Sequence, residues 1–100
     1  MILAAIFLIA PVMILADTKS VYEEKCTACH GFGVAGAPKI DDTENWIPRI
    51  AQGIEVLYKN AINGFSGQTG MMPAKGGFTE LTDEEVRVLV DHMVAEITRK

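Results

Sequence analysis

Two cysteines and a histidine stand within five consecutive residues, Cys26-Thr27-Ala28-Cys29-His30, and this motif limits what the chain can fold into more than any other feature. On a helix end, the two thiols occupy neighbouring positions of one face. Their spacing suits addition to the two vinyl groups of a haem, and His30 follows at once and can reach the iron through Nε2. The motif therefore predicts one haem c, attached covalently through Cys26 and Cys29, with His30 as an axial ligand.

Three other uses of a cysteine pair fit the sequence less well. A thioredoxin-like redox pair needs a βαβ pattern, which the sequence lacks. A zinc site needs a second pair of ligands at a plausible spacing, and none follows. A disulfide between residues three apart would close a very short loop and stabilise the fold little.

An apolar leader precedes the motif. Residues 1–16 carry no charge, and the first charged side chain is Asp17. As a helix the leader would span about 24 Å, less than the ~30 Å hydrocarbon core of a bilayer. We expect residues 1–16 to be a signal peptide cleaved before Asp17 or, alternatively, an N-terminal membrane anchor. Residues 17–100 then form one haem-binding domain, whose core is marginal in size without a stabilising group.

Helical patterns dominate the rest of the chain. Residues 18–30 contain no helix breaker before Gly31, and Thr18 is a candidate N-cap. A short helix is expected from Asn45 to Gln52, where Pro48 is tolerable only within the first turn.

Two further helices are expected towards the C-terminus. Residues 54–62 repeat apolar side chains at helical spacing. The last helix has the clearest start, because Thr82 and Glu85 form a capping box. Residues 64–81 hold five glycines and one proline, so we expect an extended loop and no strand pair. The fold class predicted is all-α, with about four short helices around one haem.

Five methionines and His92 are candidates for the second axial ligand. Two of the methionines lie in the leader, Met93 falls on the expected buried face of the last helix, and His92 falls on its wetter side. Met71 and Met72 lie in the glycine-rich loop, from which a flexible thioether can reach an iron. We favour Met72, whose backbone Pro73 would fix, and Met71 remains the alternative.

Four other residues are candidates for supporting the haem. A ligating histidine usually donates its second N–H to a carbonyl, and we assign the carbonyl of Pro38 to His30. Haem propionates need donors or cations nearby, and Trp46, Arg49 and Lys75 are the candidates.

Residues 21–97 resemble the class I c-type cytochromes and, within them, the cytochrome c5 family. The matching segments are CTACHGFGVAGAPKI, WIPRIAQG, LYKNAINGF, MMPAKGGF and LTDEEVRVLVDHMV. The resemblance implies a class I cytochrome c fold with its haem in a crevice, and a periplasmic electron carrier that is soluble or anchored. It also implies His30 and Met72 as axial ligands.

The chain departs from that family at one point. Members often carry a second cysteine pair just after the Lys-Gly-Gly turn, whereas residues 77–81 here contain no cysteine. We therefore expect packing by Phe78 and Leu81 to hold this loop.

With both axial positions filled, no site is left for a substrate, so one-electron transfer in a respiratory chain is expected rather than catalysis. The expected partners are redox proteins: a donor such as a quinol-oxidising complex and an acceptor such as a terminal oxidase or reductase. The net charge of −4 argues against nucleic acid. A membrane is involved only if the leader is retained, and a monomer is expected. The rival hypotheses are a peroxidase-like or gas-binding haem protein and a haem subunit of a membrane complex.

Overall fold

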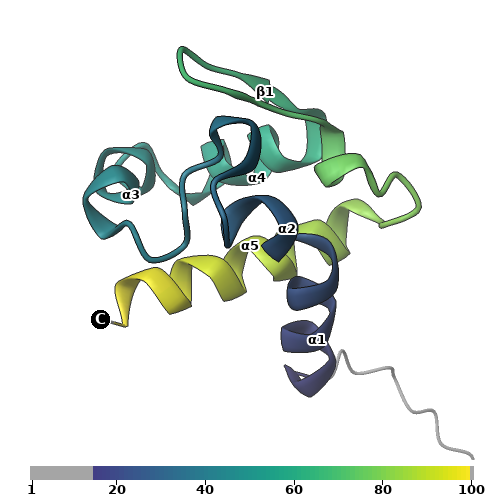
Figure 1. Ribbon diagram of the computed structural model, residues 1–100. Coiled ribbons are helices and arrows are strands. Elements are labelled where there is room, and N and C mark those ends of the chain that lie inside the picture. Colours follow the sequence, from purple (N-terminus) through teal and green to yellow (C-terminus); the bar gives the residue numbers. More distant parts are fainter. Residues whose placement is uncertain (1–14, 100) are drawn as a thin grey trace, which may run out of the picture.

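The computed structural model describes residues 15–99, so nearly all of the predicted leader lies outside the described residues. Five α-helices, a short hairpin and two tight turns make up this part of the chain, and the hairpin lies along its upper edge in Figure 1. The elements are α1 (Leu15–Lys25), α2 (Thr27–His30), η1 (Val34–Gly36), α3 (Thr43–Ile50), α4 (Ile54–Asn63), β1 (Phe65–Ser66), β2 (Met71–Met72), η2 (Ala74–Gly77) and α5 (Asp83–Thr98). The predicted all-α class is confirmed. No helix between residues 15 and 99 combines the length and hydropathy needed to cross a bilayer.

The first predicted helix is divided in two at Cys26, and it begins before Thr18, which lies within α1 and does not cap it. The backbone N–H of Cys26 still donates to Tyr22 O at 2.8 Å, but the hydroxyl of Thr27 approaches the same carbonyl at 3.4 Å. A side-chain hydroxyl that competes for a helical carbonyl bends a helix. The single-helix prediction for residues 18–30 was wrong, because α1 ends at Lys25 and α2 begins at Thr27.

Helix α3 begins two residues earlier than predicted. The Asp42 carboxylate accepts a hydrogen bond from the backbone N–H of Asn45, and this N-cap starts the helix at Thr43. Pro48 consequently lies in the second turn, and its missing N–H leaves the carbonyl of Glu44 without a helical donor. The expectation that Pro48 lies in the first turn was wrong, and the helix tolerates it by ending at Ile50.

The glycine-rich region contains a strand pair, so the prediction that residues 64–81 form an extended loop without strands was wrong. β1 and β2 are antiparallel, with Phe65 opposite Met72 and Ser66 opposite Met71. Two residues per strand are too few to show an alternating pattern. The hairpin lies directly against η1, because a Cβ atom at Gly36 would overlap the carbonyl of Thr69. Only glycine permits this approach.

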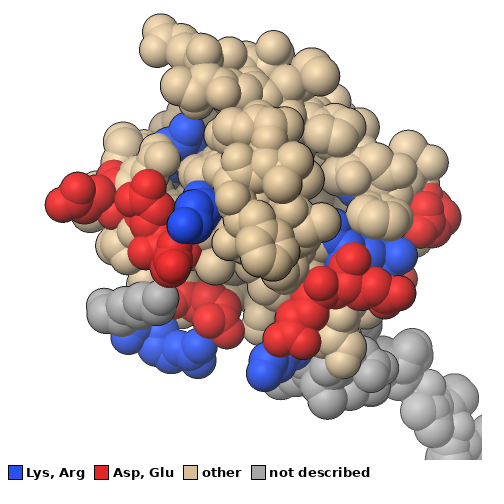
Figure 2. Space-filling view, in the orientation of Figure 1, with Lys and Arg blue, Asp and Glu red and all other residues tan. Residues whose placement is uncertain are grey.

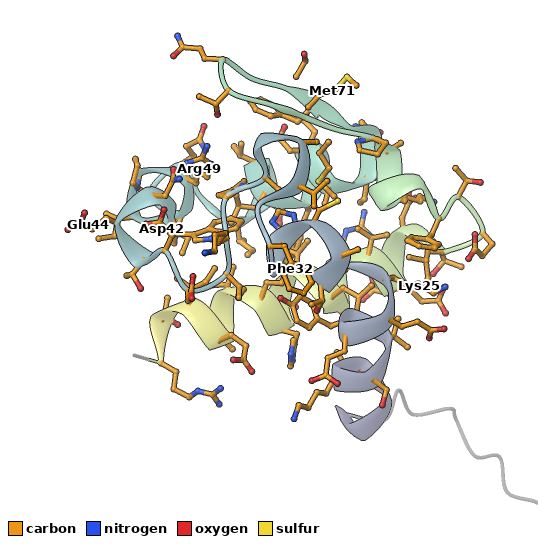
Figure 3. The ribbon with its side chains drawn as sticks, in the orientation of Figure 1. Lys25, Phe32, Asp42, Glu44, Arg49 and Met71 are labelled. Carbon is orange, nitrogen blue, oxygen red and sulfur yellow. The ribbon has the colours of Figure 1, made fainter. Side chains whose placement is uncertain are left out.

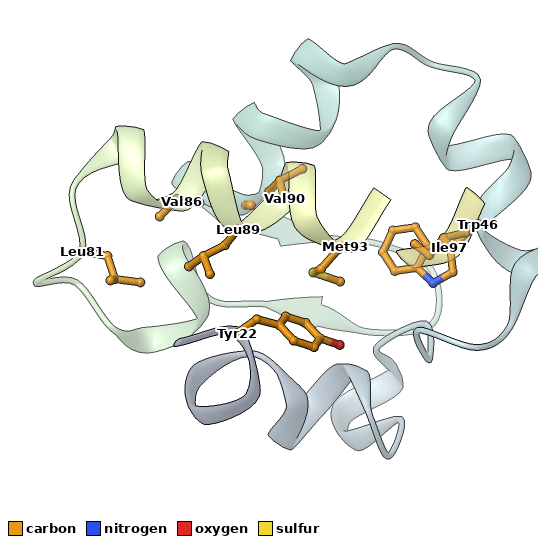
Figure 4. Close-up of a cluster of buried hydrophobic side chains, with 9 residues drawn as sticks. Tyr22, Trp46, Leu81, Val86, Leu89, Val90, Met93 and Ile97 are labelled. Carbon is orange, nitrogen blue, oxygen red and sulfur yellow. The ribbon is translucent and has the colours of Figure 1, made fainter. Parts of the chain in front are cut away.

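Helix α5 is the central element of the packing, and α1, α3 and α4 all contact it. It begins with the predicted capping box, in which Glu85 N donates to Thr82 Oγ at 3.0 Å and Thr82 N donates to the Glu85 carboxylate at 2.8 Å. Its buried face joins side chains from other elements in one cluster (Figure 4): Tyr22, Trp46, Ala61, Leu81, Val86, Leu89, Val90, Met93 and Ile97.

Half-buried apolar side chains pack against the buried cluster, and we call them the rim. They come from α1, α3, α4, α5, β2 and the loops: Val21, Cys26, Ile40, Ile50, Leu57, Tyr58, Ile62, Met72, Phe78 and Val94. The rim includes one cysteine of the motif and Met72, so the predicted site lies where the core is least enclosed.

Candidate haem-binding site

His30 is the most constrained side chain of the site. It is 8% exposed, and its Nδ1 atom lies 2.9 Å from the carbonyl oxygen of Pro38. Since a carbonyl can only accept, Nδ1 carries the proton and Nε2 keeps its lone pair. The backbone carbonyl of His30 also accepts from Ile40 N at 2.7 Å. The predicted contact with Pro38 is thus present, and it fixes the tautomer that a metal ligand requires.

The surroundings of His30 keep its ring neutral. Burial lowers the pKa of this imidazole, and the positive charge of Arg49 lowers it further, while the hydrogen bond to Pro38 acts in the opposite direction. Trp46 lies beside the ring, with 5.8 Å between ring centroids. A neutral imidazole is the form that binds a metal.

Cys26 and Cys29 are both free and half-buried. Burial raises the pKa of the Cys26 thiol to about 11, the neighbouring Cys29 raises it as well, and Lys25 acts against both. Cys26 is therefore a neutral thiol at neutral pH. Between residues 15 and 99, no cluster of three or more His, Cys, Asp or Glu side chains could hold a metal ion, so the structure lends no support to a zinc site.

The two loop methionines differ in burial. Met71 is 64% exposed, whereas Met72 is half-buried and packs against the core. Successive residues of a strand point to opposite faces, which is why the two side chains separate. The sequence left the choice between them open, and the structure turns Met72 inward.

Three predicted propionate partners already have protein acceptors. The indole N–H of Trp46 donates to Lys39 O at 2.8 Å, and Arg49 Nη1 donates to Asn45 O at 2.7 Å. Lys75 Nζ donates to Leu81 O. The propionate roles of Trp46, Arg49 and Lys75 stay predictions.

One face of the molecule around this site carries no formal charge. Neither residues 26–38 nor residues 60–74 contain Lys, Arg, Asp or Glu, and η1 and the hairpin bring the two stretches together. In Figure 2 this face is mostly tan, with charged side chains towards its sides and lower margin. Four large apolar side chains from these stretches are exposed: Phe32, Val34, Phe65 and Met71. We call this surface the uncharged face.

Phe32 is the most exposed of these side chains, at 75%, and it lies at the front of the uncharged face beside α2 (Figure 3). Phe32 was not among the site residues predicted from the sequence. Its signal was its position, since it is an aromatic residue two places after His30 in a glycine-rich loop.

The fold and the site together define a small helical protein. It has a motif suited to covalent haem attachment, a histidine oriented by a backbone carbonyl and a methionine that packs against the core. The family model described as cytochrome C oxidase, cbb3-type, subunit III matches residues 15–93. The chain belongs to the class I c-type cytochromes.

Individual relatives agree with this assignment. Cytochrome c-555 of Chlorobaculum tepidum is 47% identical over 81 residues, which cover 81% of this chain and 75% of the relative. Cytochrome c5 of Ectopseudomonas mendocina is 37% identical over 75 residues, covering 73% and 82% respectively. A cytochrome c chain solved in a crystal structure of the electron transfer complex of nitrite reductase with cytochrome c matches with a TM-score of 0.68 at 32% identity, covering 80% of this chain and 93% of that one. These relatives are electron-transfer proteins, and the class carries haem c.

Proposed function

We propose that this protein is a periplasmic one-electron carrier, with one haem c bound covalently through Cys26 and Cys29 and ligated by His30 and Met72. The observation that carries the proposal is the geometry of His30. Its Nδ1 is engaged by Pro38 O at 2.9 Å, so that a buried, neutral Nε2 is available one residue after the second thiol.

The residues present fit such a group. Both thiols are free, the methionine that turns inward is one of the half-buried side chains around the core, and those side chains are mostly apolar. When bound, the haem supplies a one-electron Fe(III)/Fe(II) couple. The chain itself orients the imidazole through Pro38 and lines the site with apolar side chains such as Leu57 and Phe78, which exclude water.

Ligation by His30 and Met72 has two consequences. A Met/His pair raises the reduction potential of a haem relative to two nitrogen ligands. With both residues holding the iron, no position would remain open for a substrate, which favours electron transfer over peroxidase-like or gas-binding chemistry.

The uncharged face is where we expect the redox partner to dock. It is formed by the stretches that carry the cysteine motif and Met72, so a partner that approaches the site meets it first. The occupant we infer is a redox protein whose own docking surface is uncharged and apolar. Weak electron-transfer encounters bury less than ~1,200 Å², and an anchor such as Phe32 suits an interface of that size. The neighbour solved with nitrite reductase supports a reductase as one kind of acceptor.

A visible spectrum and the intact mass of the purified protein test the proposal. We expect the mass of one haem added to the polypeptide and a ferric charge-transfer band at the red end of the spectrum, which indicates methionine ligation. A polypeptide of unmodified mass without Soret absorption would refute haem attachment. If haem is attached but the protein binds carbon monoxide strongly without displacing Met72, the result would instead favour a gas-binding haem protein.

One observation favours a second candidate function. The matching family model takes its description from a subunit of a cytochrome C oxidase of the cbb3 type. A retained leader would support a haem subunit that works within such a complex. Mass spectrometry of the mature N-terminus separates the two, because a carrier released to the periplasm begins near Asp17.

A further inference from the structure

The loop between Met72 and α5 is held from two sides by lysines, although no cysteine pair closes it. Residues 73–82 leave β2 through η2, where Lys75 has φ of 57°. A residue with a Cβ atom is uncommon in this left-handed region, and the conformation is strained. Two glycines follow it. Glycine would adopt the backbone conformation of position 75 without strain, yet the chain has a lysine there. This indicates that the lysine side chain serves a purpose in the loop.

Lys75 closes the loop from within. Its Nζ donates to Leu81 O at 2.6 Å and lies 3.0 Å from the carboxylate of Asp83, the first residue of α5. Only 17% of the side chain is exposed. A partly buried charged donor on a backbone carbonyl is among the stronger hydrogen bonds. Lys75 thus ties the turn just after Met72 to the start of α5.

Lys25 contacts the same loop from α1. It ends α1, directly before Cys26, and its Nζ lies 4.4 Å from the centroid of the Phe78 ring and 3.4 Å from Glu80 (Figure 3). Its side chain is 20% exposed. A cation over an aromatic face is attracted by the ring, and more strongly when water is partly excluded. Lys25 therefore joins the segment that carries the thiols to the segment that carries Met72.

We propose that Lys25 and Lys75 are positioning residues for Met72. They hold residues 73–82 closed against α1 and α5, and this closure keeps the thioether on the site. The packing of Phe78 and Leu81, expected from sequence, is one part of the closure, and the two cations complete it. This inference rests on the proposed ligation by Met72.

The test uses the haem-loaded protein and two readouts. Lys75→Gln removes the charge inside the loop, Lys25→Gln removes the charge outside it, and Lys59→Gln removes the same charge from an exposed site on α4. The first readout is the affinity of added imidazole for the ferric protein, because imidazole competes with Met72 for the iron. We expect this affinity to rise about tenfold in Lys75→Gln and in Lys25→Gln, and to stay unchanged in Lys59→Gln.

The second readout is amide hydrogen exchange, which does not depend on the iron. Three loop amides are hydrogen-bonded within the closed loop: Gly76 N, Phe78 N and Leu81 N donate to the carbonyls of Pro73, Lys75 and Phe78 respectively. We expect these amides to exchange faster in the two loop variants, whereas the amides of α5 keep the wild-type rates.

The outcomes separate the two proposals. Unchanged loop exchange and unchanged imidazole affinity would overturn the positioning role. Faster loop exchange without a change in imidazole affinity would overturn it as well, since the loop would then open without releasing the ligand. Uniformly faster exchange, in α5 as well as in the loop, would show a general effect on folding and would also overturn it. A wild-type ferric spectrum without the charge-transfer band would refute Met72 ligation itself, whatever the variants do.

Discussion

At the scale of single residues, backbone geometry determines how His30 and Met72 are oriented. The carbonyl of Pro38 fixes the proton on Nδ1 of His30, and the strand geometry of β2 turns Met72 inward and Met71 outward. Both effects come from main-chain positions, so they depend on how the loops are held as much as on the side chains themselves.

The two methionines offer a matched test of the axial ligand. Met72→Ala is expected to abolish the ferric charge-transfer band and to lower the reduction potential, because a thioether ligand stabilises the reduced state. Met71→Ala removes the same side chain from an exposed position and should keep both the band and the potential. Visible spectroscopy and a redox titration measure the two effects. Loss of the band in Met71→Ala alone would reverse the assignment.

At the scale of elements, hydrogen bonds support α5 at its start and along its contact with α4. The capping box of Thr82 and Glu85 satisfies backbone groups at the start of α5, and the hydroxyl of Tyr58 on α4 donates to Asp91 on α5 at 2.5 Å. These contacts support the helix against which the other helices pack.

Loss of the cap should destabilise the whole protein. Thr82→Ala removes the acceptor for Glu85 N, and we expect a loss of about 1 kcal/mol in the free energy of unfolding. For a domain of this size that corresponds to a fall in Tm of roughly 4–8 °C. Thr98→Ala, at the other end of α5, is the control, since its hydroxyl only bonds back to Val94 O. Thermal unfolding followed by circular dichroism compares them, and equal losses would argue against the capping box.

The Tyr58–Asp91 contact gives a signature at alkaline pH. The hydrogen bond to Asp91 raises the pKa of Tyr58 from its ordinary 10 to about 12, so the folded state holds this proton more tightly than the unfolded state. Its contribution is complete below pH 10 and disappears as the pH rises from 10 towards about 12. In Tyr58→Phe, the free energy of unfolding should fall less over this range.

Denaturant titrations at several pH values measure this difference. Tyr22, whose pKa burial also raises, remains in both proteins, so only the difference between them reports on Tyr58. Identical pH dependence of wild type and variant would contradict the assignment.

At the scale of the whole molecule, charge and apolar surface are separated. The uncharged face includes the cysteine motif and Met72, although the chain as a whole carries a net charge of −4. An interface without charges depends on apolar contact, which salt screens little, whereas a charged interface weakens strongly with ionic strength.

Electron self-exchange between two copies of the protein tests this face without a known partner. Phe32→Ser is expected to slow self-exchange several-fold, because it removes the apolar anchor of the encounter. Ile47→Ser removes another large apolar side chain from an exposed position, on α3, and should leave the rate unchanged. NMR of mixed ferric and ferrous protein gives both rates. Equal slowing in both variants, or slowing only in Ile47→Ser, would place the exchange surface elsewhere.

Local interactions explain what the sequence by itself determined. The motif at residues 26–30, the Pro38 partner of His30, the capping box and the all-α class all follow from residues close together in the chain or from helical periodicity. Tertiary structure alone decided the features that depend on contacts between distant segments. These are the burial of Met72 against the core and the uncharged face, where η1 and the hairpin meet. The contact of Lys25 with residues 73–82 is also tertiary. Lys25 and Glu80 are 55 residues apart, and only the folded chain brings them together.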